Sequence, residues 1–192
     1  MKKLLMILVL GLSLIGCTGV NMQKGQTIVG KDQTTTKLTD SEVFFVKDHI
    51  TLEKYYTTHL ILDDFSVFSG STTIVMSLKY YPDSQATYML FNDFSSQGSF
   101  FIKGILFSDR ENVVDLKIKN LSNIISSEIP NISLNKAEIL KLYEIMSNSK
   151  PITVRITANN GYFDIPFNEK YRTNFKDFLE IPLKLKLYNI SK

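Results

Sequence analysis

The chain has 192 residues, with 22 Lys and Arg against 19 Asp and Glu and a net charge of +3. This length suits one domain with a substantial core and is short for two. The near balance of charge gives no basis for binding nucleic acid. One Cys and two His leave few ligands for a transition-metal centre, so no cofactor is expected.

An apolar run follows the basic start of the chain. Lys2 and Lys3 precede residues 4–15, which are almost all apolar. About 20 apolar residues are needed to cross a hydrocarbon core of roughly 30 Å, so this run is too short to span a bilayer. A charged start and a short apolar run are typical of an export signal that is cleaved. We therefore expect residues 1–16 to be a signal peptide.

The end of this run carries a second motif. Leu14-Ile15-Gly16-Cys17 contains a branched apolar residue, a small residue and the only Cys of the chain. Residues 1–17 together resemble the signal and lipobox of a bacterial lipoprotein. The resemblance implies cleavage between Gly16 and Cys17 and attachment of acyl chains, palmitate among them, to Cys17. The alternative is an ordinary secretory signal with a chance cysteine.

The resemblance also implies a location and a partner. A lipoprotein is held in the cell envelope by two or more acyl chains and faces away from the cytoplasm. Thr18 in place of Asp implies the outer membrane in a cell that has one. Because lipid would occupy the sulfur of Cys17, neither a disulfide nor a thiol nucleophile is expected. The expected partners are the membrane, through Cys17, and a protein of the envelope.

Residues 18–42 are polar and show no lasting period. We interpret residues 17–42 as a lipidated N-terminus and flexible tether, with a short strand at Thr27-Ile28-Val29 as the alternative. Residues 43–192 would then form a single domain.

Alternation predicts strands in the first part of that domain. Apolar and polar residues alternate over 73–80 and over 113–119, which indicates a buried face and a wet face, with Ser77 and Lys79 on the wet one. Residues 86–91 and 99–107 are apolar on both faces and predict interior strands. Residues 108–112 join the last two strands as a hairpin. Successive hairpins predict an antiparallel meander.

Two helices are expected after these strands. Asn135 and Glu138 form a capping box, and apolar residues at helical spacing extend the helix over 136–148. A second amphipathic helix begins near Asn168, and we expect Pro182 to end it. The tail, residues 183–190, alternates Leu and Lys and fits an edge strand or a loosely docked end.

A hairpin is expected between the two helices. Residues 152–157 and 163–167 alternate, and a two-residue turn at Asn160-Gly161 would place every apolar residue on one side. Arg155 and Asp164 would then lie diagonally on the outer face, with Tyr162 nearby. This group is a weak candidate for ligand binding; the alternative is a cross-strand charge pair.

The order of elements predicts an α+β fold, with an antiparallel β-meander sheet followed by helix, hairpin and helix. The alternative is a β-sandwich with two helices.

The sequence contains few residue patterns that indicate catalysis or metal binding. His49 and His59 lack the spacing of a metal site, and Asp63-Asp64 is best interpreted as a solvated turn. His59 with an Asp and a Ser could form a triad, although no nucleophile motif is present. We therefore expect no catalytic and no metal-binding residues.

These observations favour a lipid-anchored envelope protein that acts as a binding or structural module. A carrier of a small apolar ligand or lipid is the first alternative, and it requires an open cavity. An envelope hydrolase is the second.

Overall fold

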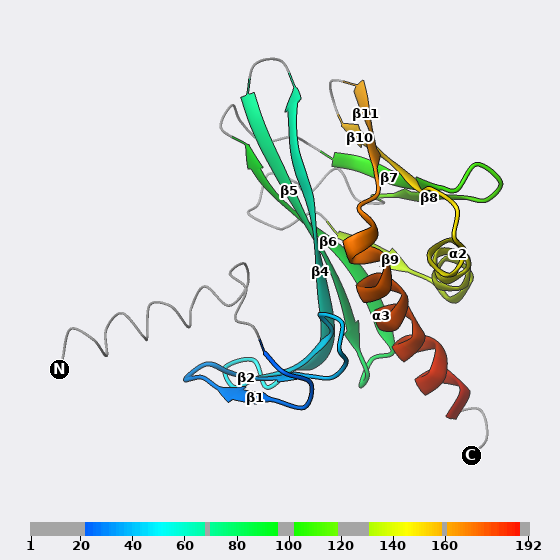
Figure 1. The fold of residues 1–192 in the computed structure, drawn as a ribbon. Coiled ribbons are helices and arrows are strands. Elements are labelled where there is room, and N and C mark those ends of the chain that lie inside the picture. The colour runs from blue at the N-terminus through cyan, green and yellow to red at the C-terminus, as the bar shows by residue number, and fades with distance from the viewer. Residues whose placement is uncertain (1–21, 68–69, 96–101, 119–130, 159–160, 189–192) are drawn as a thin grey trace.

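The computed structural model describes residues 22–67, 70–95, 102–118, 131–158 and 161–188, which form two antiparallel sheets and two helices (Figure 1). Sheet A has seven strands in the order β1 Thr27–Val29, β2 Gln33–Lys37, β3 Phe44–Asp48, β4 Lys54–Val67, β5 Gly70–Tyr81, β6 Ala86–Ser95 and β9 Asn131–Leu134. Sheet B has four strands in the order β11 Gly161–Pro166, β10 Thr153–Ala158, β7 Ile102–Ser108 and β8 Val113–Lys117. The helices are α2 Lys136–Ser147 and α3 Glu169–Tyr188.

This architecture confirms the predicted antiparallel α+β fold with a C-terminal helix, hairpin and helix. The meander holds from β1 to β6, where each strand pairs with the next. It does not continue to β7, because β6 pairs with β9 on its other edge while β7 and β8 join the hairpin in sheet B. The short strand β9 was not predicted.

The interpretation of residues 18–42 as a tether is wrong for the part of that range that the structure describes. β1 and β2 lie within it and form the outer strands of sheet A, so the alternative strand at 27–29 is confirmed. The Thr-rich run fits an edge hairpin because Thr favours extended backbone. Its hydroxyls also pair across the strands, with 2.9 Å between Thr27 Oγ1 and Thr36 Oγ1.

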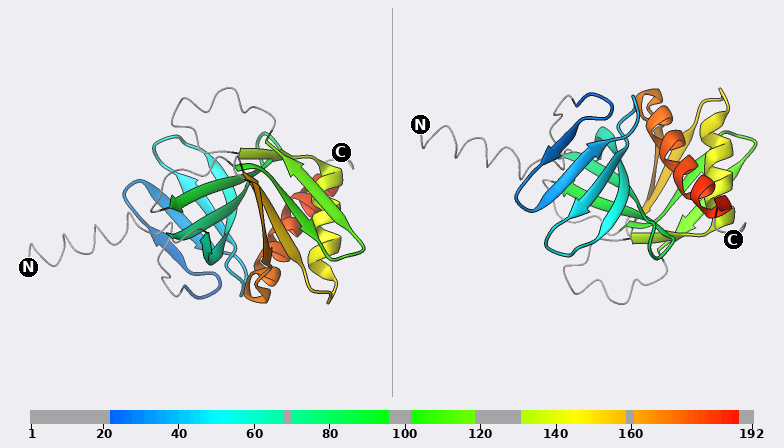
Figure 2. Two further views of the ribbon diagram at one scale, coloured as in Figure 1. Left: turned by 90° about the horizontal axis from the view of Figure 1, so that it is seen from above. Right: turned by 90° about the horizontal axis from the view of Figure 1, so that it is seen from below.

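One core joins both sheets and both helices. α3 packs against β4 and α2, and α2 also contacts β7 and β8, so the helices lie side by side along the sheets (Figure 2). The rings of Phe107 in β7 and Phe175 in α3 are 6.2 Å apart, which places α3 against both sheets. A fully buried aromatic side chain contributes roughly 1.5–3 kcal/mol, and the largest are Tyr80, Phe91, Phe107, Phe175 and Phe178.

The predicted start of α2 is confirmed in detail. Glu138 N donates to Asn135 Oδ1 at 3.0 Å, and Asn135 N donates to Glu138 Oε2 at 2.7 Å. This reciprocal capping box satisfies two backbone donors that the first helical turn would otherwise leave unpaired.

The expectation that Pro182 ends the last helix is wrong. α3 continues through Pro182 to Tyr188, so the tail is neither an edge strand nor a loose end within the described residues. Pro182 is buried, and Leu183 and Leu185 pack against the core, so apolar contact offsets the hydrogen bond that proline removes. Lys184 Nζ also pairs with Glu180 across the proline. Neither described helix is long and apolar enough to cross a membrane.

The predicted register of the β10–β11 hairpin is wrong by one pair. Ala158 lies opposite Gly161 and Ile156 opposite Phe163, so residues 159–160, which lie outside the described residues, connect the strands. A slip of one residue in each strand keeps the facing parity, so the apolar side chains remain on one side. The rule that all apolar residues share one face therefore excluded only pairings shifted by an odd number of residues, and the observed pairing is shifted by two. Arg155 therefore lies directly opposite Asp164, not diagonal to it.

Candidate ligand-binding site

The second face of sheet A is covered, which the alternation of its strands did not predict. Leu60 and Met76 point into the core, so their neighbours Thr57, His59 and Ser77 belong to the opposite face. Thr57 and Ser77 are nonetheless only 4% exposed each. Figure 1 shows β1 and β2 running across the end of β4 and β5 at a steep angle, which makes this face concave.

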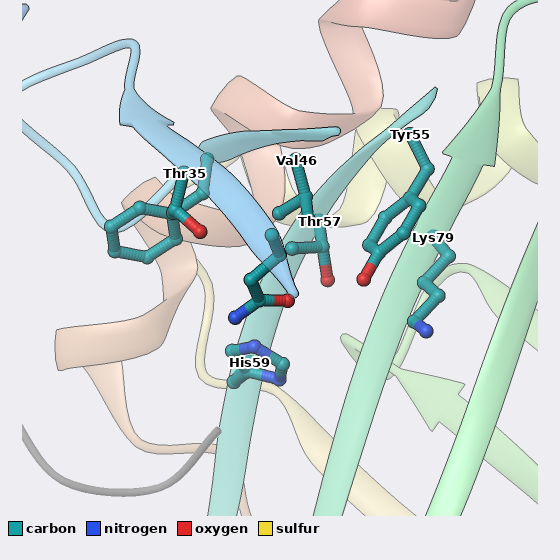
Figure 3. Close-up of a pocket in the computed structure, with 8 residues that line it drawn as sticks. Thr35, Val46, Tyr55, Thr57, His59 and Lys79 are labelled. Atoms are coloured by element: carbon teal, nitrogen blue, oxygen red, sulfur yellow. The ribbon is translucent and has the colours of Figure 1, made fainter. Parts of the chain in front are cut away.

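A cavity of about 210 Å³ lies in this concave face (Figure 3). It is lined from β2, β3, β4 and β5, by the apolar residues Phe44 and Val46 and by the polar residues Gln33, Thr35, Tyr55, Thr57, His59 and Lys79. Sites for drug-sized ligands occupy about 300–1,000 Å³, so this cavity suits a smaller molecule.

Thr57 supplies a polar atom without a partner. Its Oγ1 is buried and has no hydrogen-bond partner among the described residues. Figure 3 shows this hydroxyl pointing toward the space beside the His59 ring. A buried hydroxyl that lacks a hydrogen bond costs about 1–3 kcal/mol. This cost is recovered when a bound molecule accepts or donates a hydrogen bond there.

His59 is held in place by Ser77 on the neighbouring strand. Nδ1 of His59 lies 2.8 Å from Oγ of Ser77, and the two residues face each other in the β4–β5 ladder. Burial lowers the pKa of His59 from 6.5, Lys79 lowers it further, and Glu42 acts in the opposite direction. His59 is therefore neutral at pH 7, with one ring nitrogen engaged by Ser77 and the ring facing the cavity.

Lys79 is the cationic side chain of the lining. Its Nζ lies 4.4 Å from the centroid of the Tyr55 ring, a cation–π contact that positions the ammonium beside the cavity. Burial lowers the pKa of Lys79, while Glu53 and Asp48 act to raise it. Burial also raises the pKa of Tyr55, so its phenol stays protonated and can donate. No Asp or Glu is among the eight lining residues.

The candidate group Arg155, Asp164 and Tyr162 lies elsewhere, on the outer face of sheet B. Arg155 binds Asp164 through two hydrogen bonds, Nε to Oδ1 at 2.6 Å and Nη2 to Oδ2 at 2.7 Å. The Arg155 guanidinium carbon also lies 4.2 Å from the Tyr162 ring centroid. The two side chains meet each other's hydrogen-bonding needs. Their hydrogen bonds raise the pKa of Arg155 and lower that of Asp164. This geometry is that of a cross-strand charge pair.

The remaining candidates have structural positions or lie outside the described residues. Asp63 and Asp64 lie within β4, where the register shifts by one residue, so they form a β-bulge and not the expected turn. His49 lies in the turn after β3 and bonds to Thr34. No three His, Cys, Asp or Glu of the described residues cluster as metal ligands. Gly16 and Cys17 lie outside the described residues.

Only part of this site could be identified from the sequence. His59 was identified as a candidate, but not Thr57 or Lys79, because the polar residues of an alternating strand are expected to face solvent. Thr57 and Lys79 lie opposite each other in β4 and β5, although they are far apart in the sequence. Their meeting depends on strand register, which alternation alone does not determine.

The fold and the cavity define an antiparallel α+β protein with a small pocket, lined by polar and apolar side chains, on one face of its larger sheet. Comparison with known proteins adds no relative: the chain matches no family model, no curated protein and no solved structure.

Proposed function

We propose that this chain is a lipid-anchored protein of the cell envelope, a binding module whose pocket on sheet A takes a small organic carboxylate. The N-terminal motif that ends at Cys17 supports the anchor, with the mature chain facing away from the cytoplasm and held in the outer membrane of a cell that has one. The pocket supports binding, chiefly through the buried and unpartnered hydroxyl of Thr57.

The lining selects the class of ligand. Lys79 contributes a positive charge, Tyr55 and Thr57 contribute hydroxyls that can donate, and no lining side chain is negatively charged. In a partly dry site a carboxylate gains charge-assisted hydrogen bonds from such donors. Phe44 and Val46 add an apolar wall. A compact carboxylate with a short apolar part therefore complements the cavity in size, charge and hydrogen bonding.

The melting temperature tests this proposal. We expect members of a panel of small carboxylates to raise Tm, and their uncharged amides to do so much less. A ligand at a hundredfold excess over its Kd adds about 2.7 kcal/mol of stability, which corresponds to roughly 5–10 °C for a chain of this size. Lys79→Met should abolish the shift, whereas Lys117→Met, on the exposed face of β8, should retain it. Equal shifts from carboxylates and amides would contradict the proposal.

A hydrolase is the second candidate, because His59 and Ser77 have the separation of a base and a nucleophile. Ser77 is almost completely buried and is not among the residues that line the cavity, so a substrate in the cavity does not reach its hydroxyl. We therefore expect a fluorophosphonate probe to leave the protein unlabelled. Labelling that Ser77→Ala removes would favour the hydrolase instead.

The lining also bears on the proposed alternative of an apolar-ligand carrier. A carrier of a lipid or of another large apolar ligand needs a cavity of about 300–1,000 Å³, whereas this cavity measures about 210 Å³ and has Lys79 and His59 in its lining. A protein partner in the envelope is compatible with the binding module, and crosslinking in intact cells with wild-type and Cys17→Ala chains would identify one that depends on the anchor.

A further inference from the structure

The most exposed large aliphatic side chains of the described residues gather at one end of sheet A. Val29, Ile50 and Leu52 are 72%, 73% and 75% exposed. Val29 ends β1, and the other two lie in the turn between β3 and β4. We call these three residues the aliphatic edge. Exposed apolar side chains that cluster, rather than scatter, mark a surface that contacts a partner or a membrane.

Hydrogen bonds hold the two turns of this edge together. His49 N donates to Asp32 O at 2.8 Å, which joins the β3–β4 turn to the β1–β2 turn. Oγ1 of Thr34, the residue opposite Val29, lies 2.8 Å from Nε2 of His49. Figure 1 shows β1 and β2 at the end of the molecule away from α2 and α3. The three aliphatic side chains therefore project from one connected surface.

The β3–β4 turn is built to keep its apolar residues exposed. Asp48 Oδ1 accepts hydrogen bonds from the backbone N–H groups of Ile50 and Thr51, both at 2.8 Å. Leu52 has a φ of +62°, in the left-handed region that favours glycine. A leucine at this position bears backbone strain and gains no burial within the fold. Contact with an apolar phase outside the fold would supply that burial.

The residues that precede β1 limit how far the aliphatic edge can lie from a bilayer that holds the lipid of Cys17. Met22 O accepts a hydrogen bond from Lys37 Nζ at 3.0 Å, which fixes Met22 beside β2. Cys17 precedes Met22 by five residues, a span of at most about 18 Å for a fully extended chain. A lipid on Cys17 therefore keeps Met22, beside the Lys37 end of β2, within that distance of the bilayer surface. The aliphatic edge lies at the Gln33 end of β2, about 13 Å further along the strand. The anchor thus holds the aliphatic edge within roughly 31 Å of the bilayer surface.

We propose that the aliphatic edge inserts into the interfacial region of the bilayer that holds the lipid of Cys17. This inference rests on the proposed anchor. The charges at the edge are balanced: three lysines lie beside three carboxylates, namely Lys31, Lys47 and Lys54 beside Asp32, Asp48 and Glu53. Apolar contact and not charge then provides the attraction, so zwitterionic lipid suffices and salt has little effect.

Tryptophan fluorescence tests the contact directly, because the chain contains no Trp. Ile50→Trp creates a single fluorophore at the edge, and Val29→Trp is a second such variant. Val113→Trp is the matched control, since Val113 is 51% exposed at the start of β8 in sheet B. Each full chain would be produced in a bacterium, extracted from its membranes and reconstituted in phosphatidylcholine vesicles with brominated acyl chains.

We expect bromine to quench the edge variants at least about twofold more than Val113→Trp, since only the edge reaches acyl-chain depth. Equal quenching of all variants, or no quenching of the edge variants in chains that sediment with vesicles, would overturn the insertion alone. A chain with Cys17 intact that stays in the supernatant would overturn the anchor, and with it the insertion.

Discussion

Thr57 links the stability of the free protein to ligand binding. Thr57→Val preserves the shape of the side chain but removes the unpartnered hydroxyl, so we expect the ligand-free protein to become more stable, by up to about 1–3 kcal/mol. The same substitution should weaken the binding of a carboxylate, since it removes a donor from the cavity. Denaturant unfolding with and without ligand measures both effects. A Thr57→Val chain that is less stable when free would contradict the assignment.

Asp109 makes a second residue-scale prediction. Burial alone would raise its pKa, but hydrogen bonds from Asn112, Glu111 and Asn148 outweigh burial and lower the pKa to about 2. The folded protein therefore holds the carboxylate charged at a pH where the unfolded chain, with a pKa near 3.8, binds a proton. This contribution is complete above pH 4 and is lost as the pH falls toward 2.

Asp109→Ala removes the acceptor for four hydrogen bonds. We expect a loss of about 1–3 kcal/mol at pH 7, because four partly buried hydrogen bonds to a charged acceptor are lost. The difference in unfolding free energy between the two proteins should shrink between pH 4 and pH 2. A difference that stays constant over this range would show that the charge of Asp109 does not stabilise the fold.

Residues whose partners are near in sequence were the predictable ones. Asn135 and Glu138 are three positions apart, and Arg155 and Asp164 share one hairpin, so both pairs could be identified without a structure. The Thr57–Lys79 contact depends on the β4–β5 register. Strand register was ambiguous even in the short β10–β11 hairpin, because a shift of two residues in the pairing leaves the same side chains on the same face.

At the scale of elements, the capping box makes α2 sensitive to one side chain. Asn135→Ala removes the acceptor for Glu138 N, and we expect a loss of about 1 kcal/mol, with a range of about 0.5–2. Asn135→Asp retains an acceptor at the N-terminus of the helix and should lose much less. Thermal unfolding of both variants measures the difference. Equal losses would indicate that the side chain acts through something other than capping.

The errors at the scale of elements have a common physical origin. The tether at 18–42 and the helix end at Pro182 were predicted from composition and from the intrinsic preferences of single residues. Tertiary contacts overrode both preferences. Sheet A supplies the hydrogen bonds that make β1 and β2 strands. The packing of Leu183 and Leu185 on the core keeps α3 helical beyond its proline. Intrinsic preference is a weak determinant wherever such contacts are available.

At the scale of the molecule, the order of elements was enough to predict an antiparallel α+β fold, because sheet and helix patterns were regular. The division into two sheets was not predictable, since it depends on β6 pairing with β9 across residues 96–130. The pocket follows from the same large-scale curvature, in which β2 and β3 cover the face of β4 and β5.

The proposed anchor predicts the distribution of the whole protein. We expect the wild-type chain to sediment with membranes and to require detergent for release, because two or more acyl chains bind stably where one does not. Cys17→Ala should prevent lipid attachment and move the protein to the soluble fraction or leave it unprocessed. Mass spectrometry of the mature N-terminus identifies the lipid. A soluble wild-type chain with an unmodified Cys17 would contradict the anchor.

The most direct test of ligand binding uses the two histidines of the chain. ¹⁵N resonances of both rings would be followed during titration with millimolar propionate and, separately, with propionamide. His59 lines the pocket and His49 lies outside it, so we predict that propionate shifts the ring signals of His59, leaves those of His49 unchanged, and that propionamide has little effect. Equal responses of both rings, or no response of His59 to propionate, would contradict the assignment of this pocket as a carboxylate site.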